Sequence, residues 1–92
     1  MGDAKKNAVI VRDRQAEALR VACGLMLAGD AVEIFILDRL LDRNNPAIAM
    51  PLEMINELEL TIYSNHPDND FTEITLDEMA KKLLEYDFVV PY

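Results

Sequence analysis

Apolar and polar positions follow two different periods along this chain, and the changes of period mark out strands and helices. Four consecutive apolar residues, Ala8 to Val11, predict a strand over residues 7–13 that is buried on both faces. Residues 15–28 then carry apolar side chains every three or four positions, which predicts a helix with one buried face. Gly29 follows at the position where helices commonly end on a left-handed residue.

The same strand-then-helix order recurs along the rest of the chain. The expected elements are a strand over 31–37, a charged connection over 38–46, a helix over 47–56, a strand over 58–63, a turn-rich loop over 64–70, a helix over 75–85 and a strand over 88–92. Thr75 and Glu78 have the spacing of a capping box. Pro51 is expected in the first turn of its helix, and Met50 and Met54 are expected to fill the core.

This order predicts one α/β domain over residues 1–92, with three layers and a four-stranded parallel sheet. Because the first strand is apolar throughout, we place it centrally, in the strand order 2-1-3-4 with helices on both faces. The second and third helices then lie opposite the first. That arrangement leaves a bare patch lined by Glu59, Thr61 and Tyr63 together with alternate residues of 88–92.

Composition narrows the class of protein. The chain has 92 residues, a net charge of −8 and 51% hydrophobic residues. Acidic charge disfavours nucleic-acid binding and anionic membranes, and the apolar content suggests a homo-oligomer, a dimer or trimer. A single cysteine excludes an intrachain disulfide, residues 1–7 are polar, and no apolar run is long enough to span a bilayer. We therefore expect a cytoplasmic protein.

Three stretches resemble one family. They are LRVACGLMLAGDAVEIF (19–35), LELTIYSNHPDND (58–70) and LLEYDFVVPY (83–92), which resemble the first helix and second strand, the third strand with its loop, and the terminal strand of DsrE/DsrF-like (TusD/TusC-like) proteins. The resemblance implies a DsrE-like fold and a small oligomeric protein of sulfur relay, assembled from its own copies or with a related family subunit. Active members carry a cysteine just after the third strand. This shorter chain has Tyr63-Ser64-Asn65-His66 there.

Because that loop cysteine is missing, we expect a non-catalytic binding or accessory protein without catalytic residues, metal site or cofactor. Cys23 lies on the apolar stripe of the first helix, which is typical of a packed core cysteine rather than of a reactive thiol. A sulfurtransferase that uses Cys23 is the enzymatic alternative.

A third interpretation is a small anion- or nucleotide-binding domain. Open parallel sheets bind ligands at the carboxyl ends of their strands, close to helix N-termini. Polar residues at those ends form the candidate ligand site, namely Arg12, Arg14, Arg39, Asn65 and His66.

Overall fold

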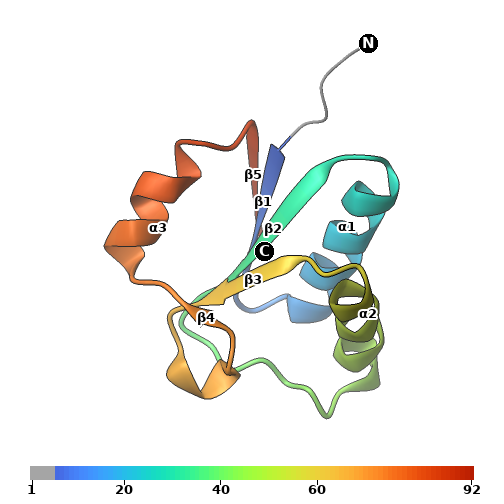
Figure 1. Ribbon diagram of the computed structural model, residues 1–92. Coiled ribbons are helices and arrows are strands. Elements are labelled where there is room, and N and C mark those ends of the chain that lie inside the picture. The colour runs from blue at the N-terminus through green and yellow to red at the C-terminus, as the bar shows by residue number, and fades with distance from the viewer. Residues whose placement is uncertain (1–5) are drawn as a thin grey trace.

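The computed structural model describes residues 6–92, which form one sheet with helices on both faces (Figure 1). The elements in chain order are β1 (Lys6–Val11), α1 (Gln15–Leu27), β2 (Ala31–Ile36), α2 (Pro46–Glu57), β3 (Thr61–Ser64), the 3-10 helix η1 (Pro67–Asn69), β4 (Thr72–Glu73), α3 (Leu76–Leu83) and β5 (Phe88–Pro91). The expected strands and helices are all present. β4 and η1 are additions that the sequence pattern did not predict.

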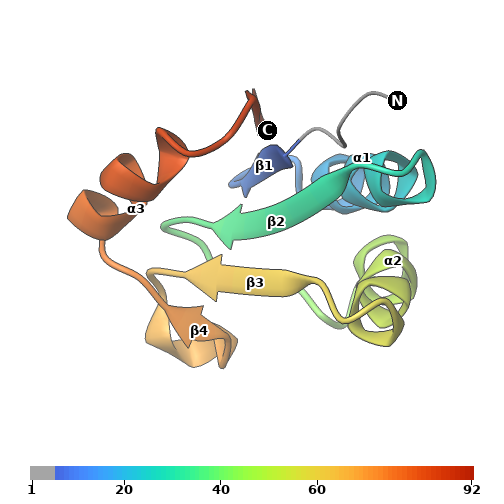
Figure 2. The same cartoon turned by 45° about the horizontal axis from the view of Figure 1, so that its top comes forward.

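All strand pairs in the sheet are parallel, and the order is β4-β3-β2-β1-β5. Val9 of β1 lies opposite Ile34 of β2 on one side and Val90 of β5 on the other. The interior position of β1 is therefore confirmed. The predicted order 2-1-3-4 is wrong, because β3 pairs with β2 and the sheet has a fifth strand. Figure 2 shows β1, β2, β3 and β4 in succession.

The reason for the different order lies in β2. Val32, Ile34, Phe35 and Ile36 of this strand are all buried, so apolar side chains occupy both of its faces. The order 2-1-3-4 would have left this strand at an edge. Placing β3 beside β2 covers it, and moves the more polar β3 and the two-residue β4 outward.

The strand order also decides which face each helix covers. The crossovers β1–α1–β2 and β2–α2–β3 step in the same direction across the sheet, so right-handed connections place α1 and α2 on the same face. The chain then returns past β2 and β1 to β5, and α3 covers the other face (Figure 1). The prediction that α2 lies opposite α1 is therefore wrong.

The predicted bare patch does not exist as one surface. β3 and β5 are separated by β2 and β1, so Tyr63 cannot share a patch with residues of β5. Tyr63 instead stacks on Phe35, with ring centroids 5.1 Å apart, on the α3 side of the sheet.

Two apolar clusters hold the layers together. The larger lies between the sheet and the α1–α2 layer, and includes Val9, Leu19, Ile34 and Ile55. The smaller lies beneath α3 and is built around Phe35, whose ring is nearly perpendicular to that of Tyr86, with centroids 5.8 Å apart. Burial is therefore deeper on the α1–α2 side. No residue of α3 itself is fully buried.

Local signals at the helix ends are confirmed with one exception. Gly29 has φ of +97° after α1, and Thr75 and Glu78 form both bonds of the capping box before α3. Pro51, however, lies inside α2 rather than in its first turn. Pro51 has no backbone N–H to donate to the carbonyl of Ala47, an exposed residue in the first turn of α2.

Met50 and Met54 are 72% and 42% exposed, so the expectation that they fill the core is wrong. Ile48, Leu52 and Ile55 face the sheet in their place. Among residues 6–92, no helix is long and apolar enough to cross a bilayer.

Candidate functional site

Three loops meet at the carboxyl edge of the sheet, as parallel strands require. Arg12 and Arg14 follow β1, Arg39 follows β2, and Asn65 and His66 follow β3. The structure brings Arg12, Arg39 and Asn65 into one connected group. Arg14 and His66 make separate contacts.

Two ion pairs join the loop after β1 to the loop after β2, and the cation comes from a different loop in each pair. The Arg12 guanidinium lies 3.3 Å from a carboxylate oxygen of Asp38, and Arg39 Nε donates to Asp13 Oδ1 at 2.9 Å. Each loop thus supplies one cation and one anion. All four side chains are largely exposed, so each pair stabilises the fold by less than about 1 kcal/mol. Their effect is to neutralise the positive charge of this edge.

Asn65 holds the loop after β2 in an uncommon backbone conformation. Asp38 has φ of +62°, in the left-handed region that few non-glycine residues adopt. The backbone N–H of Asp38 donates to Asn65 Oδ1 at 2.7 Å, and Asn65 Nδ2 donates to Asp38 Oδ1 at 2.9 Å. This two-way contact presents the Asp38 carboxylate to Arg12. We call Arg12, Asp13, Asp38, Arg39 and Asn65 the carboxyl-edge cluster.

Arg14 and His66 are each occupied locally. Arg14 pairs with Glu17 on the first turn of α1, and its guanidinium carbon lies 5.4 Å from the centre of the Tyr92 ring. Nδ1 of His66 accepts the backbone N–H of Asp68 at 3.2 Å and so caps η1. Among the described residues, neither side chain forms a hydrogen bond or ion pair with the carboxyl-edge cluster.

Asn69 is the residue of this region that sequence reasoning missed. Its side chain is fully buried, accepts the N–H of Leu41 at 2.7 Å, and donates to the carbonyl of Arg39 at 2.9 Å and to Ser64 Oγ at 2.8 Å. It therefore ties the loop after β2 to the loop after β3. An asparagine in a Pro-Asp-Asn-Asp turn has no local signal of such burial.

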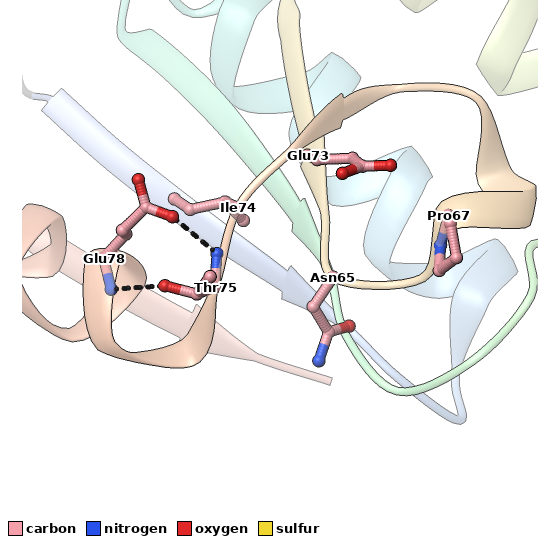
Figure 3. A pocket seen from close by; sticks show the side chains of 6 residues that line it. All are labelled: Asn65, Pro67, Glu73, Ile74, Thr75 and Glu78. Atoms are coloured by element: carbon pink, nitrogen blue, oxygen red, sulfur yellow. Dashed lines mark hydrogen bonds between the residues drawn. The ribbon is translucent and has the colours of Figure 1, made fainter.

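A cavity of about 370 Å³ opens beside the cluster, between the end of β3 and the start of α3 (Figure 3). Asn65 and Pro67 line one side, and Glu73, Ile74, Thr75 and Glu78 line the other. The hydrogen bonds with Thr75 lower the pKa of Glu78 below its usual value, which keeps it ionised. Two carboxylates and no basic side chain make this cavity unfavourable for an anion.

A second polar group lies beneath α3. The hydroxyl of Tyr86 donates to the Glu33 carboxylate, the hydroxyl of Tyr63 lies 3.5 Å from it, and Lys82 Nζ lies 3.6 Å away. Burial, together with the bond to Glu33, raises the pKa of Tyr86 well above its ordinary value. Tyr86 therefore keeps its proton at neutral pH and cannot serve as a base.

The only thiol lies far along α1 from this edge. Cys23 is 7% exposed, and its Sγ lies 3.6 Å from the Pro51 carbonyl of α2. Burial raises the pKa of the Cys23 thiol above its ordinary value. The predicted burial of Cys23 is thus confirmed. Among residues 6–92, no group of three or more histidine, cysteine, aspartate or glutamate side chains is placed to hold a metal ion.

Comparison with known proteins finds no relative of this chain. No protein-family model matches the chain, no curated protein matches it, and no solved structure matches it.

Proposed function

We propose that this protein is a non-catalytic, oligomeric binding or accessory protein related to the DsrE/DsrF-like sulfur-relay family. The observation that carries the proposal is the burial of its only thiol between α1 and α2, where burial raises the thiol pKa. Persulfide chemistry needs an accessible thiolate, and Cys23 supplies neither the access nor the charge. The protein acts by holding a partner rather than by transferring sulfur itself.

The charges of the carboxyl edge do not favour a free anion. Arg12 and Arg39 are paired with Asp38 and Asp13, and Arg14 is paired with Glu17. Each of these cations already has a carboxylate beside it, so the net attraction of this edge for a phosphate is reduced. The nucleotide- or anion-binding alternative therefore has little support at this edge.

Thiol accessibility tests the non-catalytic assignment. The native protein is treated with an alkylating reagent, and separately with a persulfide donor, and the mass of each product is measured. We expect no addition to native Cys23 and full alkylation in urea, with Cys23→Ala as the blank. Stoichiometric sulfur addition to the native protein would refute the proposal in favour of a sulfurtransferase.

A second measurement tests the anion alternative. Melting is recorded in phosphate and in chloride at equal ionic strength. We expect equal melting temperatures because the arginines of the edge are already paired. A rise confined to phosphate, abolished by Arg12→Gln or Arg39→Gln, would show that the edge binds anions.

The link to sulfur relay has its own test. We expect the gene for this chain to lie beside genes of sulfur metabolism, and a second subunit of the same family to co-purify with it when the neighbouring genes are expressed together. If no such subunit co-purifies, the link to sulfur relay is refuted and only the self-association part of the proposal stands.

A further inference from the structure

We infer that the outer face of α1 and α2 is the surface on which a second copy of this chain docks. This inference rests on the oligomeric part of the proposed function, and it names both the surface and the partner. We call the exposed residues Arg20, Gly24 and Leu27 of α1, with Met50, Glu53, Met54 and Glu57 of α2, the α1–α2 outer face.

Large apolar side chains gather on this face. Leu27 is 70% exposed, and Met50 and Met54 are 72% and 42% exposed one helical turn apart. The contact between Cys23 and Pro51 shows that the two helices touch along their shared side, so these side chains form one surface. Figures 1 and 2 both show α1 and α2 side by side, with no other described element across their outer side. Methionine adapts readily to a partner surface.

Gly24 is a separate observation that points the same way. It lies in the interior of α1, where glycine is a poorer helix former than alanine. A Cβ built at Gly24 would meet nothing within 4 Å, and its backbone is not left-handed, so no contact within the described chain requires glycine. An exposed glycine in a helix allows the backbone of a second helix to approach closely.

The charges of this face complement one another. Arg20 is exposed on α1, while Glu53 and Glu57 are exposed on α2, and none of the three forms an ion pair among residues 6–92. An isologous interface requires one surface to match itself. A two-fold axis that places α1 of one copy on α2 of the other brings Arg20 toward the glutamates of the partner. A partner surface with only one sign of charge would leave either Arg20 or the two glutamates without an opposite charge.

The size of the face can be compared with that of a standard protein–protein interface. Helices of 13 and 12 residues are roughly 20 and 18 Å long, and two packed helices span roughly 20 Å in width. The projection is thus roughly 400 Å², about half of the ~800 Å² that each partner buries in a standard interface, so the expected dimer lies at the small end of specific interfaces.

Sedimentation of matched lysine variants tests the inference. We expect the wild type to sediment at twice its 10.4 kDa mass at micromolar concentration. Gly24→Lys should weaken the dimer at least about tenfold, because a long cation then stands where the second backbone approaches. Ala80→Lys, on exposed α3, should leave the dimer unchanged. The circular dichroism spectra of the wild type and both variants should be the same, which shows that all three are folded. Met50→Lys applies the same test to α2 and should also weaken the dimer.

Charge exchange tests the identity of the partner. Arg20→Glu and Glu53→Arg should each weaken the dimer, and the double variant should regain affinity, because each copy then offers the exchanged pair. Single variants that leave the affinity unchanged would overturn the placement of α1 on α2.

Two failures are distinguishable. A wild type that stays monomeric at every concentration refutes both this inference and the oligomeric part of the proposed function. A dimer that survives Gly24→Lys and Met50→Lys but dissociates with Leu84→Lys, at the 86% exposed residue that follows α3, refutes only the surface named here.

Discussion

Replacing Asn69 by alanine should strongly destabilise this fold, although Asn69 is a polar residue in a loop at the carboxyl edge. Asn69 is fully buried, and its amide joins the loop after β2 to the loop after β3 through three hydrogen bonds. Asn69→Ala removes all three bonds. It leaves the Leu41 N–H and the Arg39 carbonyl without their partners, while Ser64 Oγ keeps the N–H of His66.

The expected loss can be worked from these contacts. An unpaired buried N–H costs about 1–3 kcal/mol, and each further hydrogen bond that is lost costs about 1 kcal/mol. We expect Asn69→Ala to lower the free energy of unfolding by roughly 3–5 kcal/mol, a large part of the ~5–14 kcal/mol expected for a chain of this length. Because one kcal/mol shifts the melting temperature of so small a domain by roughly 4–8 °C, the melting temperature should fall by at least about 12 °C.

Urea unfolding followed by circular dichroism measures this loss from the midpoint, provided the m-value stays constant. Asn44→Ala is the matched control, because Asn44 is exposed in the same region and its side chain makes no hydrogen bond among the described residues. Asn44→Ala should change stability by less than about 0.5 kcal/mol. Equal, small effects of the two variants would refute the structural role assigned to Asn69.

Three further changes have distinct signatures. Glu59 has φ of +59° just after α2, so Glu59→Gly should raise the free energy of unfolding by about 1 kcal/mol. Glu57→Gly, at the last residue of the helix, should instead lower it in the same urea assay. The folded state raises the pKa of Tyr86 and keeps a proton that the unfolded chain releases above about pH 10, so wild-type stability should fall with rising pH there by up to about 1.4 kcal/mol per pH unit. Tyr86→Phe should remove this part of the slope, and parallel pH profiles of the two proteins would contradict the assignment. Cys23→Ser should lower stability by roughly 1–3 kcal/mol because it buries a hydroxyl between helices, and a variant as stable as the wild type would show that the site is open to water.

The identity and approximate bounds of the main elements could be predicted from the sequence because their signals are local. The apolar run Ala8 to Val11 marks β1, and the Thr75–Glu78 capping box marks the start of α3, in each case within a few neighbouring residues. The burial of Cys23 followed equally from its helical stripe. For the candidate site, the sequence predicted only the correct edge of the sheet, because the carboxyl ends of parallel strands always share one edge.

The tertiary structure alone decided which strand lies beside which and what the polar side chains contact. β3 adjoins β2 because that contact covers a strand apolar on both faces, and this one choice also places α2 beside α1 and exposes Met50. The pairs Arg12–Asp38 and Arg39–Asp13 join residues 26 positions apart, and Asn69 reaches Leu41 across 28. Such partners are chosen by the packing of the whole chain, because a charged or amide side chain has the same local preferences whether it ends in water or against a distant loop.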